Sequence, residues 1–206
     1  MTAELTKLRS QTLIAEIRSI DPSYRFDSLG FPESFDGQMN QLNDLQLDRA
    51  RVYYVMRGDA RPLQVETLRF LQSRTDAAYV DGLQALKDGK LKIRLSPAEA
   101  VGNYIDRRVR DDLRGLYSFL KIPTVRGERV RINSREYDSS GSDRTYRQPD
   151  ARIDDVAFDV TLTLKTGSTG QVRGFFGSDF KPRSVVIVRP SQLGQGSTYI
   201  ITNPGN

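Results

Sequence analysis

Residues 156–165 read VAFDVTLTLK, a run in which polar side chains alternate with apolar ones. In a β-strand, residues two apart point to the same face at a spacing of about 7 Å, which places Asp159, Thr163 and Lys165 together. A carboxylate can hold a divalent cation, and a neighbouring lysine can stabilise the charge that develops on a reacting phosphate. The run therefore suits phosphodiester chemistry. It also fits the polar face of a half-exposed strand, and the pattern alone leaves both interpretations open.

Two more acids extend this candidate site. Asp150 follows a proline, and a short strand over 150–153 would pair with the run at 156–165 and bring Asp150 in as a second metal ligand. Glu99 stands at the start of a long helix and would complete a carboxylate cluster. Its place in a helix-capping box is, however, a sufficient explanation of that glutamate.

Four polar residues are candidates for binding nucleic acid. Gln171 and Arg173 open a short helix after Lys165, where Arg173 would contact a phosphate or remain an exposed charge. Arg107 and Arg110 alternate with aspartates along a predicted helix. Such residues form ion pairs four residues apart or, alternatively, contact phosphates.

The composition limits the chemistry further. The 206 residues include no Cys and no His. A disulfide scaffold, a thiolate zinc site, a cysteine nucleophile and serine–histidine catalysis are therefore excluded. A metal site would have to use oxygen ligands, which favours Mg²⁺, Mn²⁺ or Ca²⁺. No stretch approaches the roughly 18–20 apolar residues of a membrane span, so we expect no stable membrane insertion.

The charge is distributed unevenly along the chain. Residues 1–88 contain 11 Lys and Arg against 13 Asp and Glu, whereas residues 89–206 contain 20 against 13. A basic second half indicates a polyanionic partner such as nucleic acid, or else a solvated basic surface. The same boundary separates two predicted domains: a helical entry or linker region over 1–88 and a basic domain over 89–206.

Local patterns predict the elements of both domains. Helices are expected over 3–20, 44–57 and 62–87, with a loop over 23–41. In the second domain, a strand over 90–95 precedes a helix that opens at Ser96 and ends at Ile122. Strands are then expected over 125–137, 150–153 and 156–165, a helix over 169–180, and strands over 183–189 and 198–202. This order predicts an α/β fold, with a mixed sheet flanked by helices.

The residues Gln148-Pro149-Asp150, Asp159 and Thr163-Leu164-Lys165 resemble the signature of the PD-(D/E)XK nucleases. In that superfamily, a Pro-Asp on one strand and an acid-x-Lys on the next assemble a Mg²⁺ site, and a helix glutamate assists. The resemblance implies Asp150 and Asp159 as ligands of Mg²⁺ or Mn²⁺, and Lys165 as the catalytic cation. Thr163 and Glu99 would support them. The sequence departs from the signature at Thr163, which stands where the acid belongs, so that either Asp159 substitutes or Thr163 holds a water.

The wider segment from Asp150 to Thr202 is similar to the C-terminal toxin modules of bacterial polymorphic toxins, of the contact-dependent growth inhibition and Rhs types. The order of helix, three strands, helix and strand is also the core order of the nuclease superfamily. The likeness implies a nuclease, with tRNA favoured over DNA as substrate. It also implies delivery as the tip of a secreted parent protein, action in the target-cell cytoplasm, and a cognate immunity protein as partner.

Two other functions are compatible with the sequence. One is a metal-independent ribonuclease toxin of the barnase and colicin kind, in which Lys165 and Arg173 act on the 2′-hydroxyl and the phosphorane. That fold is an antiparallel meander, which the helix expected over 169–180 disfavours. The other is a module that binds nucleic acid or a protein without catalysis.

Overall fold

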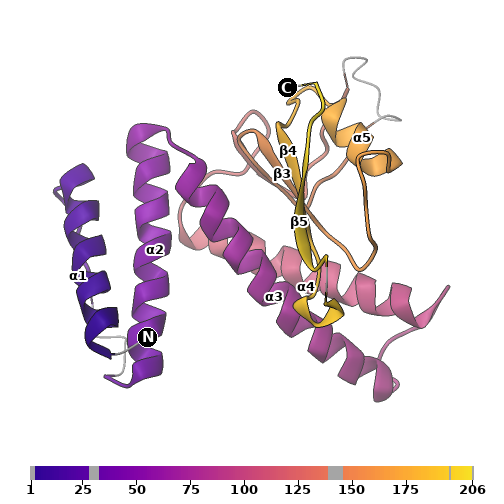
Figure 1. The fold of residues 1–206 in the computed structure, drawn as a ribbon, viewed down its shortest axis with the longest axis horizontal. Coiled ribbons are helices and arrows are strands. Elements are labelled where there is room, and N and C mark those ends of the chain that lie inside the picture. Colours follow the sequence, from indigo (N-terminus) through magenta and orange to yellow (C-terminus); the bar gives the residue numbers. More distant parts are fainter. Residues whose placement is uncertain (1–2, 28–32, 139–145, 195, 206) are drawn as a thin grey trace. The chain divides into compact units, whose positions relative to one another are not determined.

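The computed structural model describes residues 3–27, 33–138, 146–194 and 196–205, and they form two compact units, Met1–Glu66 and Thr67–Asn206. Four helices come first and a five-stranded sheet follows (Figure 1). The helices are α1 (Ala3–Ile20), α2 (Phe35–Arg57), α3 (Arg61–Lys87), α4 (Pro97–Phe119) and the short α5 (Gly170–Phe176). The strands are β1 (Val130–Ile132), β2 (Ala151–Ile153), β3 (Val156–Val160), β4 (Ser184–Val188) and β5 (Thr198–Thr202). Within the described part of the chain, no helix has the length and apolar character that crossing a bilayer requires.

The first unit is built on the packing of α1 against α2. Ile17, Leu45 and Val52 are buried at its centre. The prediction of a loop up to residue 41 was wrong, because α2 already begins at Phe35. The Ser34 side chain accepts a hydrogen bond of 3.1 Å from the Gly37 amide and thereby caps this helix.

The division between the two compact units lies inside α3, between Glu66 and Thr67. From Thr67 onward, the polar side chains of α3 bond to the second unit. The Thr67 hydroxyl lies 2.6 Å from the Tyr117 hydroxyl, and the Gln72 amide donates to the Arg189 carbonyl at 2.9 Å. Such long-range contacts leave no local signal in the sequence.

Helix α4 forms as its sequence predicts. The Ser96 side chain caps it by accepting from the Glu99 amide at 3.1 Å, and Pro97 occupies the first turn. A buried stripe runs along the helix at a helical spacing: Val101, Ile105, Val109, Leu113 and Leu116. The strand expected over 90–95 is absent, since none of the described strands pairs with this segment and most of its residues are exposed.

The α/β fold and its mixed sheet are as predicted. The strands lie in the order β1-β2-β3-β4-β5, and all neighbours are antiparallel except β3 and β4, which are parallel. Helix α5 makes the crossover between those two strands. The strand expected over 125–137 is shorter than predicted, whereas β5 has the predicted bounds.

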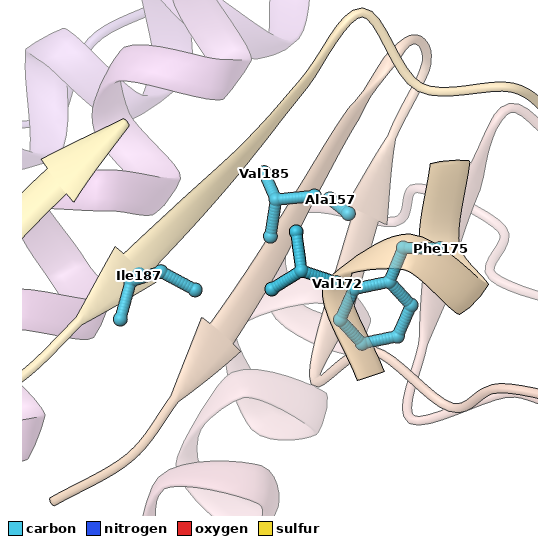
Figure 2. Close-up of a cluster of buried hydrophobic side chains, with 5 residues drawn as sticks. All are labelled: Ala157, Val172, Phe175, Val185 and Ile187. Carbon is cyan, nitrogen blue, oxygen red and sulfur yellow. The ribbon is translucent and has the colours of Figure 1, made fainter. Parts of the chain in front are cut away.

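Helix α5 covers one face of the sheet. Figure 2 shows its Val172 and Phe175 packed against Ala157 of β3 and against Val185 and Ile187 of β4, all five fully buried. The alternate residues of β3 and β4 point to the opposite face, and all of them except Val160 and Ser184 are buried as well. Most of β3, including Asp159, is therefore shielded from water.

Candidate active site at the ends of β2 and β3

A lysine, an aspartate and a glutamine form a closed triangle of hydrogen bonds at the end of β3. The Lys165 ammonium donates to Asp159 Oδ2 at 2.5 Å and to Gln171 Oε1 at 2.6 Å. The Gln171 amide donates to Asp159 Oδ1 at 2.8 Å. Asp159 is only 3% exposed. Both oxygens of a buried carboxylate are thus held by groups that fix its orientation.

The Asp159 carboxyl has a raised pKa in spite of this triangle. Burial is the largest cause and raises it, the Lys165 charge and its hydrogen bond lower it, and the nearby Asp106 carboxylate raises it further. The lysine therefore compensates only part of the cost of keeping the Asp159 charge in the interior.

Asp150 lies directly before the first residue of β2, beside the end of β3. Its amide donates to the Phe158 carbonyl at 3.0 Å. Asp150 Oδ2 accepts a hydrogen bond of 2.7 Å from the Val160 amide. Burial, followed by the charge of Asp159, raises the pKa of the Asp150 carboxyl to about 8. The two predicted metal ligands are therefore neighbours, and each is costly to ionise.

The route by which Lys165 reaches Asp159 differs from the prediction. Strand β3 ends at Val160, so the alternation expected to continue to residue 165 is interrupted. Thr163 is exposed and its amide donates to the Thr161 hydroxyl, so it is not among the residues bonded to Asp159. Residues 161–165 leave the sheet and bring the lysine back from outside the strand.

Two side chains from the last part of the chain hold this returning segment. The Arg189 guanidinium, 8% exposed, donates to the Leu162 carbonyl at 3.0 Å and to the Gly196 carbonyl at 2.8 Å. The Tyr199 hydroxyl accepts from the Lys165 amide at 2.7 Å and donates to the Lys165 carbonyl at 2.9 Å. Sequence reasoning assigned neither residue this role, because an isolated arginine or strand tyrosine carries no positional signal.

The helix acid nearest the site is Asp106, not Glu99. Asp106 raises the pKa of both Asp150 and Asp159 and forms an ion pair with Arg110. Glu99 instead accepts from the Asn103 amide at 2.7 Å and from the Leu95 amide at 3.4 Å, as part of the cap of α4. Gly102, Asp106 and Arg110 are spaced four residues apart and therefore share one face of α4. This spacing, with a small residue beside the acid, is the sequence signal that could have pointed to Asp106.

The remaining predicted residues divide between the site and the surface. Gln171 lies in the site but is bonded to Lys165 and Asp159, so it orients protein groups. Arg110 is bound to Asp106, and Arg107 is exposed on α4. Arg173 is exposed on α5, at the solvent side of that helix.

The donor set can be tested against a hard divalent cation. Among the described residues, no group of three or more acidic side chains surrounds a common point. Mg²⁺ does not require such a cage, because it is commonly held by one or two carboxylates together with waters and substrate phosphates. Asp150 and Asp159 supply two neighbouring carboxyls whose ionised forms are only partly compensated by the charges of Lys165 and Arg110, and this fits a cation of that kind.

Comparisons with known proteins found no match to this chain, whether among family models, curated proteins or solved structures.

Proposed function

We propose that the second unit is a nuclease that hydrolyses phosphodiester bonds of nucleic acid at a PD-(D/E)XK-like site, with tRNA favoured over DNA. One observation carries the proposal: the Lys165 ammonium lies 2.5 Å from a buried carboxylate, Asp159, whose charge also acts on a second acid, Asp150, next to β2. The resemblance in the sequence implies that a lysine and two acids gather at one site, and this observation supports it.

In this proposal, Asp150 and Asp159 hold Mg²⁺ or Mn²⁺. When bound, the cation supplies positive charge to a phosphate oxygen and lowers the pKa of a bound water. Lys165 stabilises the negative charge that develops on the phosphorus centre, because its ammonium is fixed in a site of low dielectric. Gln171 bonds to both the ammonium and the Asp159 carboxylate and holds them in fixed positions relative to each other.

The order of elements from α4 to β4 supports this proposal over the barnase-like alternative. It runs helix, three strands, helix, strand, as the resemblance implies. The alternative needs an antiparallel meander, whereas β3 and β4 are parallel and are connected through α5.

The biological role is proposed on the sequence resemblance. The chain would serve as the toxin tip of a secreted parent protein, act in the cytoplasm of a target cell, and be neutralised by a cognate immunity protein. The basic second half agrees with a substrate that is a polyanion.

The experiment is incubation of the protein with total tRNA and with plasmid DNA, in Mg²⁺ or in EDTA, followed by gel electrophoresis. We expect cleavage in Mg²⁺ only, and a loss of at least about 100-fold in Lys165→Met, as for removal of a transition-state charge partner. Lys181→Met is the matched control, because Lys181 is exposed and is not among the residues bonded in the triangle.

Each contrary result has a distinct meaning. Cleavage that survives EDTA contradicts the metal-dependent mechanism and favours the metal-independent ribonuclease. Binding of nucleic acid without any product contradicts the enzyme and favours the non-catalytic module.

A further inference from the structure

A groove of about 680 Å³ runs between the segment 90–94 and the first half of α4. Two carboxylates line it, Asp106 and Asp111. They are outnumbered by six cationic side chains: Lys90, Lys92, Arg94, Arg107, Arg108 and Arg110. The segment 90–94 is the one expected to be a strand, and its lysines and arginine are exposed in place of being paired in a sheet. The absence of this strand thus creates a basic wall opposite a basic helix face.

The cations of the groove are not all compensated. Lys90 is paired with Asp88 at 3.0 Å, Arg108 with Asp112 at 3.7 Å, and Arg110 with Asp106. Within the described residues, Lys92, Arg94 and Arg107 have no carboxylate partner and all three are exposed. Three uncompensated charges that converge on one hollow attract an anion with several charges along its length.

The groove adjoins the candidate active site. Asp106 lines the groove, and its charge raises the pKa of both Asp150 and Asp159. One turn earlier on α4, a Cβ built at Gly102 would lie 3.8 Å from Leu162, in the segment that carries Lys165 toward Asp159. A chain lying in the groove along α4 would therefore pass Asp106 at the entrance to the site.

We propose that this groove binds the phosphodiester backbone of the nucleic-acid substrate and directs it along α4 to Asp159 and Lys165. The proposal rests on the proposed function for its reacting end, and it assigns substrate contacts to Lys92, Arg94 and Arg107. Tyr104 and Asn103 also line the groove, and they supply an aromatic surface and an amide for an unstacked base. A hollow with several cations and an aromatic ring suits an RNA or DNA strand better than the flat surface of an acidic protein.

The test measures binding in EDTA on a Lys165→Met background, so that cleavage does not interfere. The groove variant carries Lys92→Gln, Arg94→Gln and Arg107→Gln. The control variant carries Lys121→Gln, Arg126→Gln and Lys181→Gln, which remove the same charge from exposed positions outside the groove. Affinity for total tRNA, and for single-stranded RNA and DNA of one sequence, is measured from 0.05 to 0.5 M salt, and thermal unfolding confirms that both variants fold.

Each phosphate contact contributes about 0.7 to the slope of log affinity against log salt for single strands, so three lost contacts lower the slope by about 2. At 0.15 M salt this corresponds to a loss of affinity on the order of 50-fold. We expect this loss in the groove variant and little change in the control. The RNA and DNA arms show which backbone the groove prefers.

Equal affinities and equal salt slopes for the groove and control variants would overturn the groove as the binding site. The same conclusion would follow if the Lys165→Met protein without further substitutions bound no nucleic acid. Groove variants that bind nucleic acid normally but lose an acidic protein partner would overturn it in favour of a protein interface. A protein that binds through the groove yet cleaves nothing would leave this inference standing and overturn the proposed function instead.

Discussion

Replacement of Asp150 by asparagine should make the folded protein more stable at neutral pH while it removes cleavage. The Asp150 carboxyl accepts one hydrogen bond, from the Val160 amide at 2.7 Å, and the asparagine oxygen can accept the same bond. What the substitution removes is a carboxyl that must take up a proton when the protein folds at neutral pH, because burial and the Asp159 charge raise the pKa of Asp150 to about 8. A residue retained only for stability would not carry this cost.

The direction of the pH dependence follows from proton binding. A raised pKa means that the folded protein holds the Asp150 proton between about pH 4, the pKa in the unfolded chain, and about pH 8, whereas the unfolded chain releases it. The free energy of unfolding of the wild type therefore falls as pH rises through this interval, and it is constant with respect to this group outside it. The contribution is at most about 1.4 kcal/mol for each pH unit.

The assay is urea unfolding of the wild type and of Asp150→Asn at intervals from pH 4 to pH 8. The difference between the two free energies of unfolding reports Asp150 together with its interaction with Asp159, because the titrating groups elsewhere are shared. We expect this difference to grow in favour of the asparagine variant as pH rises. Mg²⁺ should stabilise the wild type by mass action and should have less effect on the variant.

The reasoning would be refuted by parallel pH profiles in which Asp150→Asn is less stable than the wild type throughout. Asp150 would then be an ordinary acceptor for the Val160 amide, and its nearness to Asp159 would have no functional meaning.

Two further predictions concern the residues that surround the triangle. Tyr199→Phe removes both hydrogen bonds to the Lys165 main chain. The loss should cost about 2 kcal/mol of stability and lower kcat on the order of tenfold with KM unchanged. A change in KM alone would contradict a positioning role for Tyr199. Asp106→Asn should impair cleavage, whereas Glu99→Gln should leave kcat unchanged and cost less than about 1 kcal/mol in thermal unfolding, because Glu99 serves the cap of α4. If Glu99→Gln impaired cleavage and Asp106→Asn did not, Glu99 would be the helix acid that supports the site.

The sequence predicted the elements whose signals are local. The capping box at Ser96 placed the start of α4 correctly, because the serine oxygen and the following proline act within one turn. The alternation from Val156 to Val160 correctly predicted a strand there, with Asp159 on the same face as Ala157. Lys165, which the alternation placed on the face of Asp159, is bonded to it, although by a different route, and Asp150, chosen because it follows a proline, lies within reach of the Asp159 charge.

The errors arose where distant contacts decide the structure. Residues 161–165 continue the alternation of β3, but Arg189 binds the Leu162 carbonyl and Tyr199 binds the Lys165 main chain, and these contacts take the segment out of the sheet. The segment 90–95 has strand-like residues but no described strand pairs with it. A period of two shows that a segment can form a strand, whereas a partner strand determines whether it does.

Burial of charge does not by itself identify a functional site in this protein. Glu136 is also buried, and its pKa is raised mainly by that burial, but it lies between Arg131 at 2.8 Å and Arg152 at 3.2 Å. There, two cations face one carboxylate, so the charges oppose the cost of burial. At Asp159 the balance is reversed, since Asp150 and Asp106 act on a site whose bonded cation is Lys165. An excess of negative charge in the interior is relieved when a proton or a further cation binds, and this asymmetry between the two clusters favours the ends of β2 and β3 as the place where the proposed divalent cation would bind.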